Sequence, residues 1–281
     1  MLIVEHIREM QKWSGVQRLQ GKRLVLVPTM GFLHQGHLGL IREGRKRGDL
    51  LVVSIFVNPT QFGPHEDLAS YPNDFERDRG LLEKEGVDAL FHPAAEMIYP
   101  EGFQTSVEVG RLGRFLCGPH RPGHFRGVAT VVVKLFNIVS PHVAVFGLKD
   151  YQQFLIVRRV VEDLNLEVEI VGVPIVRDEG GLAASSRNTY LTREGRKAAL
   201  CLQRSLRRAE GLVREGERDG VKITQRVIAE IAREPLARVE YVQLCNPESL
   251  EATGTIHGEA LLALAVWIDK SRLIDNTVLK A

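Results

Sequence analysis

The chain has 281 residues, of which 44% are hydrophobic, and its 37 basic and 35 acidic residues leave a formal net charge of only +2. This is the composition of an ordinary globular protein, and it gives no overall field that would attract nucleic acid or an anionic membrane. Three cysteines without a CxxC pair, an N-terminal segment without a signal-peptide pattern and the lack of a membrane-length apolar run favour reduced thiols in the cytoplasm.

Short runs rich in β-branched residues alternate with segments whose apolar residues recur at helical spacing. The runs are predicted to be buried strands, at residues 24–28, from residue 50, and at 87–91, 143–147 and 168–176. Helices are predicted within residues 37–48, 74–86 and 150–164. This alternation predicts an α/β fold with a doubly wound, Rossmann-like parallel sheet. Its ligand is expected beyond the carboxyl ends of the strands.

Two further segments bear on the domain organisation. Residues 127–139 combine β-branched residues with a length typical of a buried helix, and we interpret them as a helix. After Val176 a polar, glycine-rich loop leads to a long charged helix, a second helix near 221–233 and candidate strands at 239–244 and 261–268. We therefore expect a Rossmann-like domain at 1–176 and a smaller α+β domain at 177–281.

The sharpest motif is PTMGFLHQGHL, residues 28–38, which follows the first predicted strand and runs into a helix. A helix that begins there aims backbone N–H groups and the positive end of its dipole at one point, which favours phosphate. His34 and His37, three residues apart, can both face that point. A histidine pair alone is more often structural, so the candidate depends on this strand-turn-helix context.

Other polar residues follow predicted strands. Gln61 lies in a proline- and glycine-rich loop, and its amide can form hydrogen bonds with a hydroxyl or carboxylate group of a substrate. The composition of the loop is equally typical of an ordinary surface loop. Asp78 is a candidate Mg²⁺ ligand, because phosphate chemistry usually brings a hard cation that prefers carboxylate oxygen, but its neighbouring acids also suit the start of a helix. His124 stands at another predicted helix start, where a structural and a functional role are equally open.

Lys149 stands where a strand leads into a helix, a position suited to a phosphate. The simpler interpretation is that Asp150 and Gln153 have capping-box spacing and only begin the helix. The loop SSRN, residues 185–188, carries hydroxyls and a guanidinium suited to phosphate oxygens, although its composition is that of any polar loop.

The His-x-Gly-His arrangement resembles the signature of the nucleotidyltransferase superfamily that includes class I aminoacyl-tRNA synthetases. With the segments FVNPTQFGP, RPGHFRGVATVV, GLKDYQQF, RDEGGLAASSRN and ALLALAVWIDKSRLIDN, it resembles the pantothenate synthetase family over nearly the whole chain. The resemblance implies that pantoate attacks the α-phosphate of ATP, releasing pyrophosphate. The amine of β-alanine then attacks the pantoyl adenylate, releasing AMP.

The resemblance also implies roles for particular residues. His37, His34 and Lys149 are implied to be catalytic, and Gln61, Gln153 and His124 to bind substrate, with Mg²⁺ as cofactor. The residues implied to bind ATP are Met30, Gly31, His34, Gly36, His37, Gly147, Lys149, Asp150, Val176, Ala184, Ser185, Ser186 and Arg187. The domain at 1–176 is implied to bind nucleotide and pantoate, and the smaller domain at 177–281 to act as a lid. A homodimer is typical of the family. Neither a nucleic-acid nor a membrane partner is expected.

Three positions depart from the pattern of the family. Phe32 stands where Ala is common, Leu148 where an acid or Gln is common, and Ala184 where Met or Leu is common. None of them removes a proposed catalytic group, so we expect altered affinities rather than a different reaction.

Two alternatives to a ligase remain at this point. One is a nucleotidyltransferase that leaves AMP on its product, although the segments around Gln61 and Gln153 argue against it. The other is a module that only senses ATP or binds RNA. A module that binds without catalysis would release no pyrophosphate with any acid.

Overall fold

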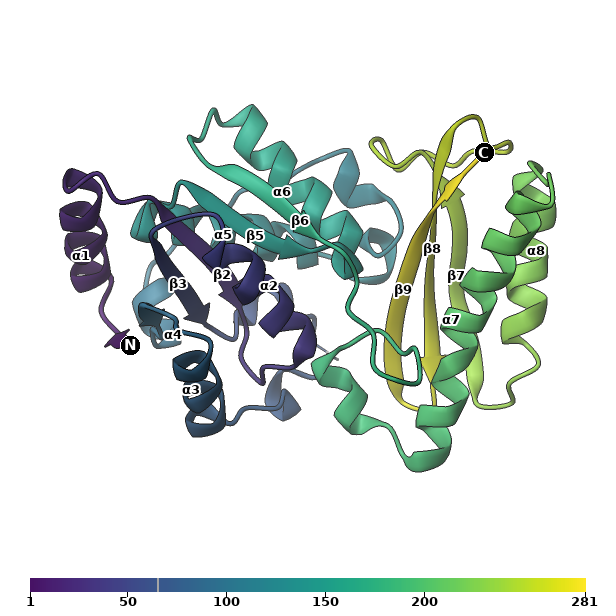
Figure 1. Cartoon of the computed structure of the whole chain (residues 1–281), viewed down its shortest axis with the longest axis horizontal. Helices are drawn as coiled ribbons and strands as arrows, with labels where there is room; N and C mark the ends of the chain where they lie inside the picture. The colour runs from purple at the N-terminus through teal and green to yellow at the C-terminus, as the bar shows by residue number, and fades with distance from the viewer. Residues whose placement is uncertain (65) are drawn as a thin grey trace. The chain divides into compact units, whose positions relative to one another are not determined.

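A computed structural model describes residues 1–64 and 66–281, which divide into two compact units. The first comprises residues 1–113, 120–148 and 153–174, and the second comprises 114–119, 149–152 and 175–281. Figure 1 shows the course of the chain through both. The domain boundary at residue 176 and the lid role remain predictions. None of the helices in the described part is long and apolar enough to cross a membrane.

The first unit is built on a parallel sheet of six strands in the order β1-β4-β3-β2-β5-β6. These strands are β1 (Leu2–Val4), β2 (Leu24–Thr29), β3 (Leu50–Ile55), β4 (Ala89–Phe91), β5 (Val143–Gly147) and β6 (Glu169–Val173). The chain adds β3 on one side of β2 and β5 on the other. This reversal is a topological switch point, beside which ligands bind in folds of this kind. The predicted doubly wound α/β fold is confirmed.

Helices cover both faces of this sheet because alternate strand residues point to opposite sides. Leu26 and Val52 pack with α1 (Ile7–Leu19), α4 (Ala95–Ile98), α5 (His124–Val139) and α6 (Tyr151–Asp163). Val25 and Val53 pack on the other face with α2 (Gln35–Arg45) and α3 (Phe75–Lys84). Residues 127–139 are therefore helical, as interpreted from the sequence, and the length of the segment outweighs its β-branched residues.

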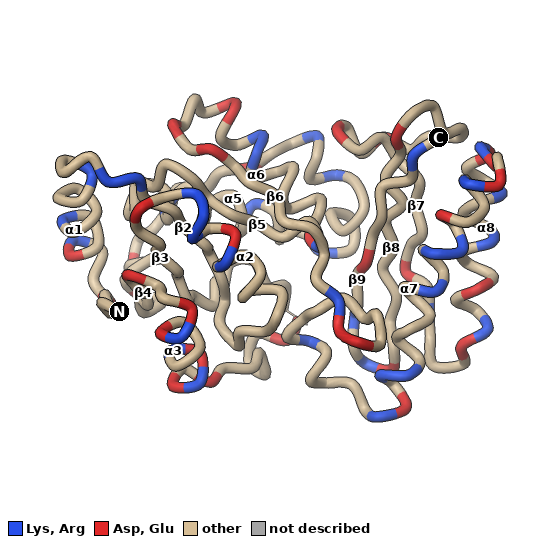
Figure 2. Tube along the Cα trace, viewed as in Figure 1, with Lys and Arg blue, Asp and Glu red and all other residues tan. Residues whose placement is uncertain are grey.

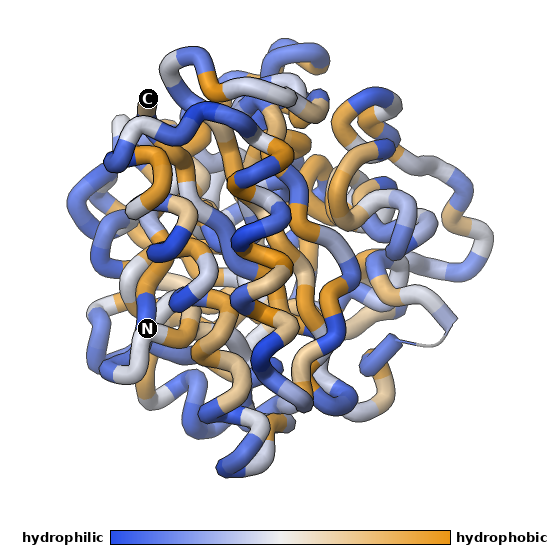
Figure 3. The backbone as a smooth tube through the Cα atoms, turned by 90° about the vertical axis from the view of Figure 1, so that its right-hand side faces the viewer, coloured by the Kyte–Doolittle hydropathy of each residue, from blue (hydrophilic) through white to orange (hydrophobic). Residues whose placement is uncertain are grey.

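The second unit packs two helices on one face of an antiparallel sheet. The strands β7 (Ala237–Cys245), β8 (Glu259–Ile268) and β9 (Ser271–Lys280) follow one another in the sheet, and α7 (Arg193–Arg214) and α8 (Gly220–Ile231) cover it. Lys and Arg are interspersed with Asp and Glu along these helices (Figure 2). Hydrophobic and hydrophilic stretches alternate along the backbone (Figure 3), as expected of helices with one buried face. This agrees with the predicted smaller α+β part.

Short 3-10 turns complete the described chain. They are η1 (Pro59–Gln61), η2 (Leu68–Ser70), η3 (Leu112–Arg114), η4 (Gly118–His120), η5 (Leu148–Asp150) and η6 (Ser186–Tyr190). Three of them, η1, η5 and η6, carry residues that the sequence assigns to the site.

Candidate active site

The histidine pair lies where β2 leads into α2, beside the switch point of the sheet. His34 is the N-cap of α2, and its Nδ1 accepts a hydrogen bond from the amide of Gly36 over 3.1 Å. The Nδ1 of His37 accepts one from the amide of His34 over 3.3 Å. The two rings stack with their centroids 4.0 Å apart. The sequence therefore places both imidazoles at the positive end of the dipole of α2.

These hydrogen bonds determine which ring nitrogen carries the proton. A nitrogen that accepts an N–H bond has no proton of its own, so in the neutral form of each ring the proton is on Nε2. Each neutral imidazole thus has an Nε2–H donor besides its Nδ1 acceptor. This is a suitable arrangement for binding phosphate oxygens.

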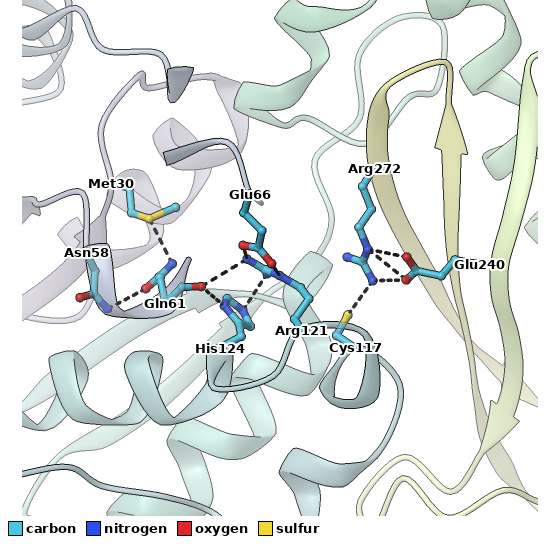
Figure 4. A network of polar contacts seen from close by, with 9 residues as sticks. All are labelled: Met30, Asn58, Gln61, Glu66, Cys117, Arg121, His124, Glu240 and Arg272. Atoms are coloured by element: carbon cyan, nitrogen blue, oxygen red, sulfur yellow. Dashed lines mark hydrogen bonds and ion pairs between the residues drawn. The ribbon is translucent and has the colours of Figure 1, made fainter. Parts of the chain in front are cut away.

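Gln61 lies at the end of the neighbouring strand β3, in η1 (Figure 4). Its Nε2 donates to the sulfur of Met30 over 3.1 Å, and its Oε1 accepts from the Nδ2 of Asn58 over 3.1 Å. Helix α5 supports this turn closely, since a Cβ added to Gly127 would lie 2.4 Å from the carbonyl oxygen of Thr60. Met30 and Gln61, both predicted site residues, are therefore in contact.

His124 supports the backbone of the same turn. Its Nε2 is 2.9 Å from a guanidinium nitrogen of Arg121, which only donates, so that ring nitrogen accepts. The proton is then on Nδ1, which donates to the carbonyl oxygen of Gln61 over 2.8 Å. The structure therefore engages both ring nitrogens of His124 in holding Gln61. Its predicted role in direct substrate binding remains a prediction.

Arg121 is itself fixed by a carboxylate. Its guanidinium binds Glu66 through two hydrogen bonds, of 2.8 and 2.6 Å. Burial acts to raise the pKa of Glu66, but the hydrogen bonds and charge of Arg121 outweigh it, and the pKa lies below its ordinary value. The pair therefore stays ionised at neutral pH and holds the Gln61 turn through His124.

Gly147 and Gln153 are the remaining candidates of the first unit. Gly147 ends β5, the other neighbour of β2, and Gln153 lies half-buried in the first turn of α6. Both positions are at the carboxyl end of the sheet, as the sequence predicts.

The second unit holds the other predicted ATP residues in two places. The carbonyl oxygen of Lys149 accepts a hydrogen bond from Asn276 on β9 over 2.9 Å, and its Nζ is 3.8 Å from Asp150. In the loop before α7, the amide of Ala184 donates to the carbonyl oxygen of Val176 over 2.9 Å. Ser185 then caps η6, which carries Ser186 and Arg187, by accepting from the amide of Arg187 over 3.3 Å.

Arg177 anchors this loop to its own sheet. The guanidinium donates to both carboxylate oxygens of Asp275 over 2.6 and 2.9 Å, and Asp275 is almost fully buried. The start of the loop that carries Ser185 and Arg187 is thus fixed to β9.

Comparison with known proteins identifies the family. The family model described as Pantoate-beta-alanine ligase matches residues 2–278. The chain belongs to the pantoate-beta-alanine ligase family. A pantothenate synthetase of Thermotoga neapolitana is 55% identical over 99% of this chain and 100% of its own length, and one of Heliobacterium modesticaldum is 54% identical over the full length of both chains.

Solved structures agree with the sequence comparison. The crystal structure of pantothenate synthetase from Thermus thermophilus has a TM-score of 0.94 at 45% identity and covers 99% of both chains. A pantoate-beta-alanine ligase from Francisella tularensis, complexed with beta-gamma ATP and beta-alanine, has a TM-score of 0.80 at 32% identity and covers 99% of this chain and 97% of its own. The family resemblance expected from the sequence is confirmed.

The predicted metal ligand of this family member, Asp78, has other partners. Its side chain is almost fully buried, and Oδ1 accepts from the amide of Leu33 over 2.8 Å. Burial raises the pKa of Asp78 above its ordinary value, although the amides of Leu33 and Phe32 act in the opposite direction. Among the described residues, no group of three or more His, Cys, Asp and Glu side chains suits a metal ion. Asp78 thus already accepts hydrogen bonds from backbone amides, and its assignment as a Mg²⁺ ligand stays a prediction.

Four supporting residues were missed in reading the sequence. Asn58 lies within the FVNPTQF segment, and an Asn before Pro that caps a turn is a signal available from sequence. Arg121, Glu66 and Arg77 gave no such signal, because their partners are residues distant in the chain.

Proposed function

We propose that the chain condenses pantoate with β-alanine to form pantothenate at the expense of ATP. In the first step, an oxygen of the pantoate carboxylate bonds to the α-phosphorus and the bond to pyrophosphate breaks. In the second, the amine of β-alanine bonds to the acyl carbon, AMP leaves and the amine loses a proton. Membership of the ligase family, and a relative determined with a form of ATP and β-alanine, support this activity.

The observation that carries the proposal is the orientation of the two imidazoles. Because both Nδ1 atoms accept backbone amides, the proton of each neutral ring is on Nε2, so each ring has an Nε2–H donor at the N-terminus of α2. Charge that develops on the oxygens of the α-phosphate would be stabilised there by donors that need no reorganisation. One such donor is worth about 100-fold to 1,000-fold in rate. We assign the main catalytic role to His37 and an ATP-binding role to His34.

The other roles follow the family resemblance and the local geometry. Gln61, held between Met30 and Asn58, is proposed to bind pantoate together with Gln153. Lys149 is proposed to stabilise phosphate charge. The remaining ATP contacts are proposed for Met30, Gly31, Gly36, Gly147, Asp150, Val176, Ala184, Ser185, Ser186 and Arg187.

Magnesium is proposed to arrive as part of the substrate, as the complex of Mg²⁺ with ATP. A hard cation prefers oxygen ligands, and the triphosphate supplies them without a cluster of protein carboxylates. We also propose a homodimer and a cytoplasmic location. The resemblance supports the first, and three buried free cysteines support the second. Light scattering on the purified chain tests the dimer.

The test of the reaction supplies its substrates in order. Purified protein is mixed with ATP, Mg²⁺ and pantoate, and β-alanine is added later while pyrophosphate, AMP and pantothenate are measured. We expect free AMP and pantothenate to accumulate in equal amounts only after the amine is added. A stable adenylylated product, with AMP never released, would instead identify a nucleotidyltransferase. ATP binding without pyrophosphate release would identify a module that only binds.

A further inference from the structure

The loop that joins β2 to α2 has an unusual backbone. Gly31 and Phe32 both have positive φ, of 82° and 49°. Glycine adopts this region freely, but a side chain such as that of Phe32 does so at a cost of roughly 1–3 kcal/mol. Two such residues in succession, directly before the histidines, require neighbouring groups that hold them in place.

Two consecutive residues in the first turn of α3 hold this loop. Asp78 accepts the amide of Leu33 over 2.8 Å, and Arg77 donates to the carbonyl oxygen of the same Leu33 over 2.8 Å. Arg77 and Asp78 are themselves joined over 3.2 Å. Both backbone groups of the residue before His34 are therefore fixed by α3, and we call Arg77 and Asp78 the α3 clamp.

The clamp also contacts the two residues with positive φ. The guanidinium carbon of Arg77 lies over the ring of Phe32, 5.1 Å from its centroid. A Cβ added to Gly31 would lie 3.3 Å from Oδ2 of Asp78 and 3.0 Å from a methyl group of Ile55, so the carboxylate closes directly on that glycine. Phe32, where the family commonly has Ala, thus gains a partner in Arg77.

We propose that Arg77 and Asp78 are positioning residues for the His34–His37 pair, acting through the backbone of Leu33. The proposal rests on the catalytic role assigned to that pair. A shift of Leu33 carries the N-cap residue His34 with it, and His37 is tied to the amide of His34. Misplacement of a catalytic group by about 1 Å can cost about 100-fold in rate.

The burial of Asp78 explains why a carboxylate suits this position in the α3 clamp. Asp78 is 1% exposed, and its oxygens face backbone amides rather than solvent. An Asn at this position keeps one acceptor oxygen but turns an NH₂ group, which only donates, toward the other donor. Asp78→Asn is therefore a nearly isosteric change that disturbs the loop without leaving a cavity.

The experiment compares Asp78→Asn and Arg77→Ala with a control, Arg79→Ala. Arg79 lies on the same helix and pairs with Glu76 and Glu83 at 3.8 and 3.1 Å. We expect kcat to fall about 100-fold in Asp78→Asn and less in Arg77→Ala, with the KM for β-alanine unchanged. The imidazole NMR signals of His34 and His37 in the ligand-free protein should move in both variants. Arg79→Ala should match the wild type in all these measurements.

Two outcomes would contradict the clamp. Unchanged kcat and unchanged histidine signals in Asp78→Asn would overturn it, as would activity restored by excess Mg²⁺, which would make Asp78 a metal ligand. If Asp78→Asn does not fold, kcat and the histidine NMR signals of Arg77→Ala test the clamp instead, and the clamp is wrong if both are unchanged. If the wild type forms no pantothenate, the proposed function fails, while the ligand-free NMR signals still test the clamp.

Discussion

The amide nitrogen of His34 donates to Nδ1 of His37 over 3.3 Å, so the residue proposed for catalysis also helps to cap its own helix. The two tasks use different ring atoms. Capping uses Nδ1 as an acceptor, whereas phosphate binding would use Nε2–H as a donor. A substitution can therefore remove one task and keep the other.

His37→Asn should separate capping from catalysis. The amide oxygen of Asn can stand in for Nδ1, so the unfolding temperature should stay near that of the wild type. Nothing replaces Nε2–H, so pyrophosphate release should fall about 100-fold to 1,000-fold. His37→Ala should show the same kinetic loss together with a loss of about 1 kcal/mol of stability, because the cap is also removed. Turnover of His37→Asn near the wild-type rate would remove His37 from the mechanism.

Gly127→Ala should displace the turn that carries Gln61, because Gly127 of α5 packs directly against it. The added Cβ would lie 2.4 Å from the carbonyl oxygen of Thr60 and 2.7 Å from the amide of Gln61, and neither backbone atom can move alone. We expect a loss of about 1–3 kcal/mol of stability, as for other overpacked sites. Because Gln61 moves with the turn, the KM for pantoate should rise while ATP binding is retained.

The matched control for this change is Gly211→Ala in α7. A Cβ at Gly211 meets no atom within 4 Å, so the change should stabilise the protein by about 0.5–1 kcal/mol through helix propensity. Its KM for pantoate should equal that of the wild type. An equal KM for pantoate in Gly127→Ala would show that the position of the turn does not matter for this substrate.

The sequence predicted the parts of the fold that have a strong local pattern. The buried strands β2, β3 and β5 are largely apolar runs rich in β-branched residues, as is typical of parallel strands buried on both faces. The strand β1 was missed because it has only three residues, and α1 and β9 were missed because their patterns are less regular.

The parts of the candidate site that depend on contacts between distant residues could not be predicted from the sequence. His34 and His37 were found from a strand-turn-helix pattern, but Arg77 acts on Leu33, which lies 44 positions away in the chain. Asp78 was assigned to a metal on chemical type alone. Only coordinates reveal that its carboxylate is buried against the loop that carries the histidines.

Gln153→Ala tests whether Gln153, in the first turn of α6, binds pantoate. If Gln153 binds substrate, the KM for pantoate should rise about tenfold or more, since a lost hydrogen bond to a charged group costs about 1.5–3 kcal/mol. The dissociation constant for ATP, measured by calorimetry, should not change. If Gln153 only begins the helix, stability falls slightly and the KM for pantoate stays the same.

His142 should make stability depend on pH. Its Nδ1 accepts the amide of Leu24 over 3.0 Å, where β5 begins beside β2. Burial lowers the pKa of His142 below 6.5, and the charges of Arg18 and Arg23 lower it further. Because the folded pKa lies below the unfolded one, the unfolded chain binds the proton more readily. The contribution of His142 is therefore complete above about pH 6.5 and is lost as the pH falls through the folded pKa.

His142→Asn isolates this effect, because its amide oxygen can accept the amide of Leu24 but does not titrate. We expect the unfolding free energy of the wild type to decrease as the pH falls below about 6.5, and that of His142→Asn to decrease less over the same window. Denaturant unfolding at a series of pH values measures both slopes. His257→Asn, at an exposed histidine of the second unit, is the control and should keep the wild-type slope. Equal slopes in the wild type and His142→Asn would mean that the proton is bound equally well in the folded and unfolded chains, contrary to the effect expected from partial burial of the ring and the charges of Arg18 and Arg23.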